Sequence, residues 1–247
     1  MSNLSWVFLG LFSFNAAFGQ GVSYKEIRQF QQQRFKEGYC LDFLRAEDFP
    51  EFNLEDLQQI IIVRHGEPAM NKKGWRNREE AIIYTRMYDA VGVYDFDKKP
   101  ICMRAYDVPV VYTSRLPRAI NTAEKTINGE IPIMQMALFN EFERKIIKFP
   151  NLKLPMKFWS VTSRFVWVLG FNNKEIESFS EAKERSHEAA SLLNQSAQRD
   201  GKALLFAHGF LNKYIKKYLK DLGYVALNLN GQQYLGAYYF YKFRTGE

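Results

Sequence analysis

The pattern of hydrophobic and polar positions alternates between short apolar runs and longer amphipathic stretches. Residues 60–63 form a continuous β-branched run, which is typical of a strand buried on both faces of a sheet. Similar short runs predict strands at residues 108–112, 131–136, 203–207 and 238–241. Apolar residues that recur every three or four positions predict helices at residues 78–91, 116–127 and 211–222. Residues 24–36 look like a polar N-terminal helix, and residues 180–198 predict a helix whose N-terminal half is charged. Strands that alternate with helices predict one α/β domain whose mostly parallel sheet is flanked by helices on both faces.

The stretch between residues 150 and 170 is rich in aromatic side chains and follows neither pattern clearly. We expect helical or irregular cover there. Trp159 and Trp167 could line a substrate pocket, but packing over the sheet is the commoner use of such side chains and is the interpretation we prefer.

The first nineteen residues contain no charged side chain, and their apolar run at 4–14 is too short to span a bilayer. The run resembles the apolar region of a secretory signal, with small residues at Ala17 and Gly19 before a mature start at Gln20. We therefore predict a signal peptide at 1–19, no stable membrane span and a periplasmic or secreted protein. The alternative is a cytoplasmic protein whose N-terminal segment is buried or frayed.

Composition narrows the choice of ligand. The net charge of +7 favours anionic partners, but no run of five like charges and no recognised motif points to nucleic acid. Cys40 and Cys102 match neither a zinc site nor a CxxC redox pair. The two thiols either form a disulfide or remain unpaired, because the sequence does not report the distance between them.

Unusual polar residues follow three of the predicted strands. Arg64, His65 and Gly66 follow the first strand, residues 114–118 follow the second, and His208 and Gly209 follow a later one. The chain has only three histidines, and two of them occupy equivalent places after a strand and before a glycine. Because ligands bind at the carboxyl ends of parallel strands, we expect these residues to converge at one edge of the sheet.

Such a cluster suits a phosphate monoester. Attack by a neutral imidazole on a phosphate dianion requires cations around the phosphate oxygens. The guanidinium groups of Arg64 and Arg118 can bind these oxygens in pairs, and His208 can add a further donor. Glycine after each histidine lets backbone and phosphate approach closely. This electrostatic design needs no metal ion and no cofactor.

Two longer motifs strengthen this interpretation. Arg64-His65-Gly66-Glu67 resembles the signature of the histidine phosphatase superfamily, which has the phosphoglycerate mutase-like fold. Residues 114–123 are similar to the family segment S-x-L-x-R-A-x-x-T-A, and His208-Gly209 matches the second catalytic histidine of the family. The motifs occur in the family order and extend from residue 59 to the C-terminus. We therefore divide the chain into a helical extension at 20–58 and a histidine phosphatase domain at 59–247.

The resemblance implies a role for each matching residue. His65 would be the nucleophile that becomes phosphorylated, and Arg64, Arg118 and His208 would bind the phosphoryl group. Residues expected to line the substrate pocket are Asn71, Gly66, Gly209 and Ser114. The proton donor is assigned to Glu141, with Glu143 as the alternative.

The resemblance leaves the substrate open. The family continuation G-x-W-E-G is absent, and Asn212-Lys213 stands where many members carry an arginine. We expect hydrolysis of a phosphorylated small molecule through a phosphohistidine on His65. The alternatives are a phosphoglycerate mutase-type phosphotransferase and an inactive phosphate-binding module. The oligomeric state is not predicted.

Overall fold

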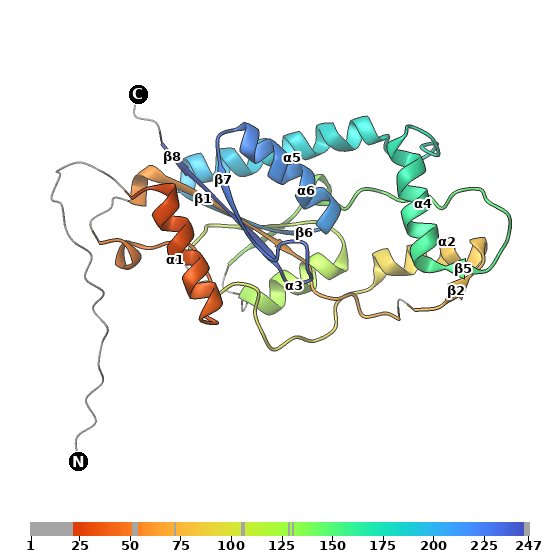
Figure 1. The fold of residues 1–247 in the computed structure, drawn as a ribbon, viewed down its shortest axis with the longest axis horizontal. Coiled ribbons are helices and arrows are strands. Elements are labelled where there is room, and N and C mark those ends of the chain that lie inside the picture. The colour runs from red at the N-terminus through yellow and green to blue at the C-terminus, as the bar shows by residue number, and fades with distance from the viewer. Residues whose placement is uncertain are drawn as a thin grey trace, which may run out of the picture.

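The computed structural model describes residues 22–50, 54–71, 73–104, 107–127, 129 and 131–244. The predicted signal peptide at 1–19 lies outside these residues. The described chain forms an α/β body with a smaller lobe at one end (Figure 1). No helix in this part of the chain is long and apolar enough to cross a membrane.

The body is built on a six-stranded sheet with the strand order β4-β3-β6-β1-β8-β7. Four adjacent strands are parallel: β4 (Ile133–Gln135), β3 (Val111–Thr113), β6 (Lys202–Ala207) and β1 (Leu57–Arg64). β8 (Ala237–Phe243) runs antiparallel to both β1 and β7 (Val225–Leu229). The predicted mostly parallel sheet is confirmed, while β7 was not predicted.

Helices cover both faces of this sheet, as predicted. α5 (Phe179–Asp200) and α6 (Gly209–Asp221) lie on one face, and α1 (Tyr24–Lys36) and α3 (Pro117–Ile127) lie on the other (Figure 1). Short 3₁₀ turns are formed by Ala46–Asp48, Leu54–Asp56 and Ala137–Phe139. α1 and α5 begin with capping boxes, in which Ser23 and Ser178 accept the N–H of a glutamate three residues later.

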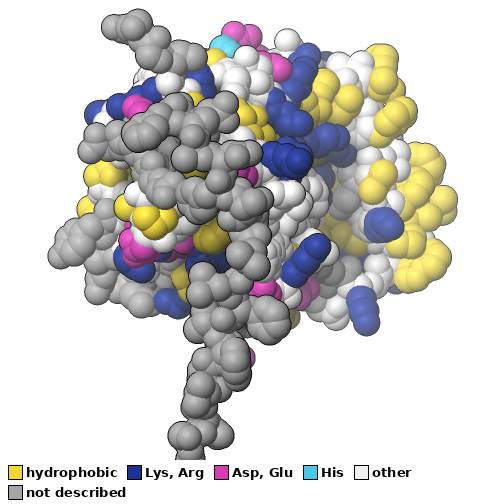
Figure 2. Space-filling view, turned by 60° about the vertical axis from the view of Figure 1, so that its left-hand side comes forward, with side chains coloured by type: hydrophobic (Ala, Val, Ile, Leu, Met, Phe, Trp, Pro, Cys, Tyr) yellow, Lys and Arg dark blue, Asp and Glu magenta, His cyan; other side chains and the backbone are white. Residues whose placement is uncertain are grey.

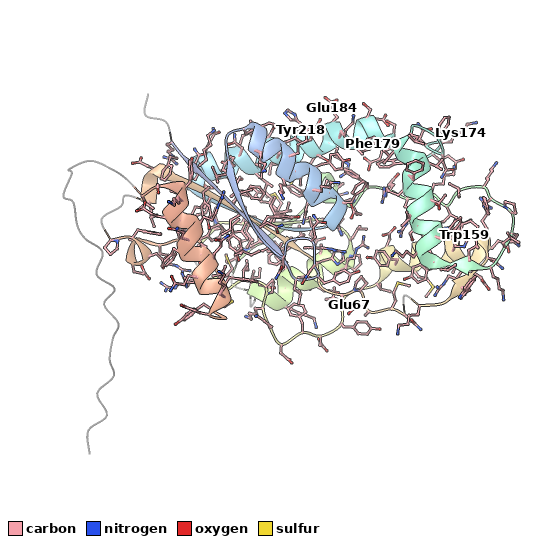
Figure 3. The ribbon with its side chains drawn as sticks, viewed as in Figure 1. Glu67, Trp159, Lys174, Phe179, Glu184 and Tyr218 are labelled. Carbon is pink, nitrogen blue, oxygen red and sulfur yellow. A yellow bond between two sulfur atoms is a disulfide. The ribbon has the colours of Figure 1, made fainter. Side chains whose placement is uncertain are left out.

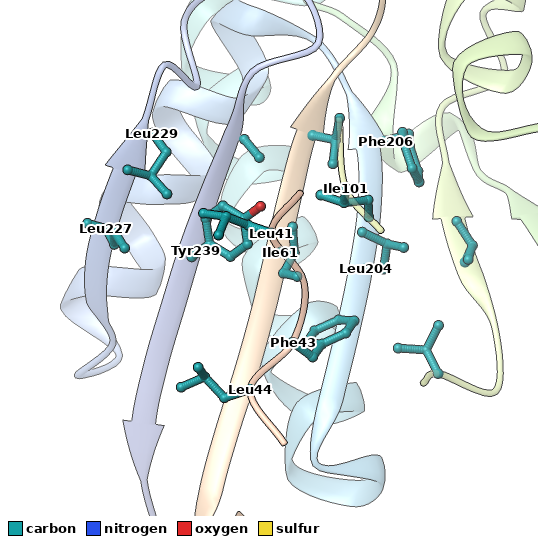
Figure 4. Packing of buried hydrophobic residues seen from close by; sticks show 14 of the residues in the cluster. Leu41, Phe43, Leu44, Ile61, Ile101, Leu204, Phe206, Leu227, Leu229 and Tyr239 are labelled. Carbon is teal, nitrogen blue, oxygen red and sulfur yellow. The ribbon is translucent and has the colours of Figure 1, made fainter. Parts of the chain in front are cut away.

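The β-branched run predicted at 60–63 is buried on both faces. Ile60 and Ile62 belong to the core beneath α5 and α6, whereas Ile61 and Val63 belong to the core on the opposite face. Figure 4 shows how the segment before β1 contributes to that second core, where Leu41, Phe43 and Leu44 lie over the sheet. The domain boundary at residue 59 stays a prediction drawn from the sequence.

The open question about the cysteines has a definite answer. Cys40 and Cys102 form a disulfide with a Cα–Cα distance of 5.6 Å. Close by, the Arg45 guanidinium pairs with both Asp42 and Asp107, the latter at 2.8 Å. Burial and the neighbouring Asp107 raise the pKa of the Asp42 carboxyl. These links tie the N-terminal segment to the body.

The smaller lobe consists of α2 (Arg78–Ala90), α4 (Met156–Val168) and the two-stranded pair β2 (Trp75–Arg76) and β5 (Leu154–Pro155). Its small core is formed by Ala81, Tyr84, Ile146, Ile147, Met156 and Trp159. Trp159 is fully buried and donates from its indole nitrogen to the Arg76 carbonyl at 2.8 Å. Trp167 is buried among side chains of the body. Both tryptophans therefore pack in cores, as expected.

Candidate active site

The three strand ends singled out from the sequence meet at one edge of the sheet. β3, β6 and β1 are parallel neighbours, so their carboxyl ends lie side by side. Backbone hydrogen bonds continue this alignment past the strands: His65 N–H donates to the Ala207 carbonyl at 3.0 Å, and Ser114 N–H donates to the Phe206 carbonyl at 3.4 Å. The predicted convergence is confirmed for His65, Ser114 and His208.

His65 lies at the centre of this edge. It is buried, and its ring centroid lies 5.0 Å from that of His208. Its Nδ1 lies 2.7 Å from the Gly66 carbonyl oxygen. Because a carbonyl can only accept, Nδ1 must carry the proton, and Nε2 of the neutral ring then carries the lone pair. His65 is thus held in the tautomer that a nucleophile requires.

His208 is held in a complementary way. It is fully buried, and its Nε2 lies 2.7 Å from the Ser114 hydroxyl oxygen, which also accepts the N–H of Leu116. Ser114 can therefore donate its own proton to Nε2, which places the ring proton of neutral His208 on Nδ1. Burial first, and then Arg118, His65 and Arg64, lower the pKa of His208 well below its ordinary value.

The two arginines approach from different elements. Arg118, in the first turn of α3, is buried and donates to the Tyr88 carbonyl at 2.9 Å and the Asp89 carboxylate at 3.1 Å. Arg64 donates to the Gln232 carbonyl, and its guanidinium carbon lies 4.3 Å from the centre of the Tyr234 ring. Both side chains are thus oriented by protein contacts at one end of the guanidinium.

Three buried nitrogen atoms in this cluster have no hydrogen-bond partner among the described residues: Arg64 Nε, Arg118 Nε and His208 Nδ1. Buried donors are ordinarily satisfied, because an unpaired buried polar group costs about 1–3 kcal/mol. An oxyanion accepts hydrogen bonds from donors of this kind. Among all the residues that the structure describes, no group of three or more His, Cys, Asp or Glu side chains forms a candidate metal site.

Both glycines stand where an added side chain would crowd its neighbours. A Cβ at Gly209 would lie 3.0 Å from Arg64 Nε, so the absence of a side chain there lets the guanidinium lie over the start of α6. A Cβ at Gly66 would lie 3.3 Å from a Leu235 methyl, and the Gly66 N–H donates to Thr122 Oγ1 at 2.9 Å. Direct contact of these glycines and of Ser114 with substrate stays a prediction.

The acidic candidates separate clearly. Glu141 accepts the N–H groups of Phe210 at 3.2 Å and Leu211 at 3.0 Å, so its carboxyl caps α6 directly after His208. Glu143 is exposed and accepts the Glu177 N–H at 3.3 Å, at the approach to α5. Glu141 is therefore the candidate that adjoins the histidines.

Asn71 does not join this cluster by any hydrogen bond of its described side chain. It is exposed, and its carbonyl oxygen accepts the Lys73 N–H at 2.9 Å within the loop after β1. A role in substrate binding stays a prediction that requires the loop to rearrange.

Two tyrosines in the pocket were missed by sequence analysis. The ring of Tyr234, between β7 and β8, lies 5.5 Å from the His65 ring. Tyr88, near the end of α2, lies 4.7 Å from the Arg118 guanidinium carbon. Burial first, and then Tyr234, raise the pKa of the Tyr88 hydroxyl. Neither residue belongs to a motif, and only the tertiary fold brings Tyr234 beside His65 and Tyr88 beside Arg118.

Comparison with known proteins identifies the family. The model of the histidine phosphatase superfamily (branch 1) matches residues 60–243. The chain belongs to the histidine phosphatase superfamily. The predicted family and its phosphoglycerate mutase-like fold are thus confirmed. No curated protein matches this chain in sequence.

Several solved structures are similar to this chain at low identity. A phosphoserine phosphatase from Entamoeba histolytica is 15% identical over 76% of this chain and 98% of its own, with a TM-score of 0.40. A putative alpha-ribazole-5'-P phosphatase from Escherichia coli is 14% identical over 66% and 80%, with a TM-score of 0.41. A mycobacterial glucosyl-3-phosphoglycerate phosphatase is 16% identical over 66% and 79%, with a TM-score of 0.39.

Proposed function

We propose that this histidine phosphatase hydrolyses phosphate monoesters of small molecules through a phosphohistidine on His65. The observation that carries the proposal is the set of unpartnered buried nitrogens on Arg64, Arg118 and His208, in the cluster that also holds His65. Three such donors beside a pair of buried histidines suit a phosphoryl group that is attacked by His65. Family membership supports the same chemistry.

The proposed reaction has two steps. Nε2 of His65 forms a bond to phosphorus as the bond from phosphorus to the ester oxygen breaks, and the departing alkoxide takes a proton from the acid. Water then attacks phosphorus, gives one proton back to the acid, and releases His65 and inorganic phosphate. Arg64 and Arg118 stabilise the charge on the phosphoryl oxygens in both steps. His208 stays neutral and donates a hydrogen bond from Nδ1 to the phosphoryl group.

Glu141 is the acid in this proposal. Its carboxyl lies at the start of α6 beside His208, whereas Glu143 hydrogen bonds to the approach of α5. Glu141→Gln should lower turnover strongly on alkyl phosphates and much less on aryl phosphates, whose leaving groups need little protonation. Glu143→Gln is the matched control and should retain activity on both. Equal losses in the two variants would refute the assignment.

The central test is hydrolysis of an aryl phosphate in the presence of a chelator, with His65→Ala beside the native protein. We expect turnover that His65→Ala abolishes while its circular dichroism and thermal unfolding stay native-like. Turnover by folded His65→Ala would refute the nucleophile. No turnover by the native protein, with phosphate still bound, would favour an inactive phosphate-binding module. Transfer of phosphate to an added phosphoglycerate in place of water would favour a mutase.

We also propose that the protein acts in an oxidising compartment outside the cytoplasm. The Cys40–Cys102 disulfide supports this proposal, because disulfides persist mainly in exported proteins. The apolar, uncharged pattern of residues 1–19 fits the same interpretation. N-terminal sequencing of the protein from fractionated cells tests it: a start at Gln20 in the exported fraction is expected, and an intact cytoplasmic chain would refute it.

A further inference from the structure

α4 carries apolar side chains on two opposite faces. The inner face contains Met156, Trp159, Ser163 and Trp167, all of them buried. The outer face contains Phe158, Val161, Phe165 and Leu169, which recur at the same spacing of three and four residues. A surface helix ordinarily buries its apolar face and turns polar residues to water. Among the described residues, those of the inner face of α4 are covered, whereas the apolar residues of its outer face are exposed.

The outer face is strongly exposed. Val161, Phe165 and Leu169 expose 58%, 62% and 56% of their surface. The face continues beyond the helix, since Phe171 is 65% exposed and Phe149 contacts the Phe158 ring at 5.9 Å. Figure 2 shows hydrophobic side chains gathered at the right-hand edge of the molecule, with Lys and Arg side chains beside them. A contiguous exposed apolar face of this kind indicates an interaction surface.

The charged residues of the segment that carries this face have a single sign. Residues 144–174 contain seven basic residues and no acidic one. Lys148, Lys153, Lys157 and Lys174 are all exposed. Figure 3 shows that Trp159 and Lys174 lie toward opposite ends of α4, so the basic residues extend along the whole helix. Lys145 pairs with Glu175, just outside this stretch.

We propose that the outer face of α4 docks on the surface of an anionic lipid bilayer. An interfacial helix combines exposed aromatic and aliphatic side chains with surrounding lysines, which interact with acidic headgroups. A second copy of this chain fits the outer face of α4 less well, because its lysines would lie against the lysines of the first copy. Docking requires no spanning helix, since only the side chains of one face enter the interface.

The docking helix also contacts the loop that carries the candidate acid. Arg164 of α4 is half-buried and donates to the carbonyls of Phe142 and Glu143 at 2.9 Å each, in the loop that also carries Glu141. The docking residues themselves remain outside the catalytic cluster.

The test is co-sedimentation with vesicles of phosphatidylcholine, with and without about one third phosphatidylglycerol. The full chain and the chain starting at Gln20 are both used, so that binding by residues 1–19 is measured separately. We expect binding to the anionic vesicles only, weakened by 0.5 M salt because screening reaches a few ångströms there. Lys153→Gln and Lys157→Gln should each weaken binding about fivefold, the equivalent of about 1 kcal/mol per charge at the membrane surface.

The apolar contribution has its own variant and control. Phe165→Ser combined with Leu169→Ser should lower vesicle binding at least tenfold while leaving aryl phosphate turnover unchanged. Met134→Ser, on the edge strand β4, removes a side chain that is also 48% exposed and should not alter binding. No binding by the chain from Gln20, or binding that survives the double variant, would overturn the proposal. A concentration-dependent dimer that the double variant abolishes, without vesicle binding, would overturn it in favour of a second copy.

Discussion

We expect His208 to make the folded protein less stable as the pH falls from 7 to 5. His208 is fully buried, and burial together with Arg118, His65, Arg64 and Arg185 lowers its pKa well below 6.5. In the unfolded chain the imidazole has an ordinary pKa of about 6.5 and takes up a proton below that pH. The unfolded state then binds more protons than the folded state, so acid favours unfolding.

The size of the effect follows from the unfolded-state pKa alone, as long as the folded imidazole stays neutral. Protonation of His208 in the unfolded chain lowers the free energy of unfolding by about 0.2 kcal/mol at pH 7 and by about 2 kcal/mol at pH 5. The difference of about 2 kcal/mol is a substantial share of the stability of an ordinary domain.

Urea unfolding at pH 5, 6 and 7 in phosphate-free buffer measures this loss. His208→Asn removes the titrating group. Between pH 7 and pH 5 this variant should therefore lose about 2 kcal/mol less unfolding free energy than the native protein. His187→Asn is the matched control, because it removes an exposed histidine on α5 outside the pocket and should follow the native curve. Parallel curves for the native protein and His208→Asn would refute the reasoning.

Three further predictions concern contacts of the pocket and the disulfide. Gly209→Ala should displace the Arg64 guanidinium, whose Nε would lie 3.0 Å from the new methyl, and lower kcat/KM for an aryl phosphate by about tenfold or more; unchanged kinetics would contradict the close approach. Ser114→Ala should cost about 1–3 kcal/mol in urea unfolding, because it leaves the buried His208 Nε2 without its partner; a neutral effect would show that this hydrogen bond contributes little. Cys40→Ser with Cys102→Ser should cost about 4 kcal/mol, since the bridge closes a loop with a sequence separation of 62 residues; equal stability of oxidised and reduced native protein would contradict this.

The sheet and the catalytic cluster could be predicted because their signals are local in the sequence. The run at 60–63 is buried on both faces of β1. Residues that follow neighbouring parallel strands lie at the same edge of the sheet in any fold of this kind. His65 and His208 could therefore be paired from their places after strands alone. The family resemblance added Arg118, which lies 54 positions from Arg64 in the numbering and has no local signal that links the two.

Residues that join the pocket only through tertiary packing could not be found this way. Tyr234 lies in a loop between two antiparallel strands, and Arg64 both contacts its ring and donates to the Gln232 carbonyl of the same loop. Tyr88 has the apolar spacing of any helix residue that faces a core. The second role of Glu141 was equally hidden, since a carboxyl that caps a helix 69 residues away leaves no periodic trace.

α4 escaped assignment for a different reason, and the reason bears on function. A periodic pattern identifies a helix by the contrast between an apolar and a polar face. Phe165 and Trp167 are both large and apolar, yet the first is 62% exposed and the second 2% exposed, so residue type alone does not separate the two faces of α4. The outer face carries apolar residues where a helix facing only water ordinarily carries polar ones. The feature that concealed the helix is thus the same one that points to a partner surface, and vesicle binding by Phe165 and Leu169 is the measurement that connects the two.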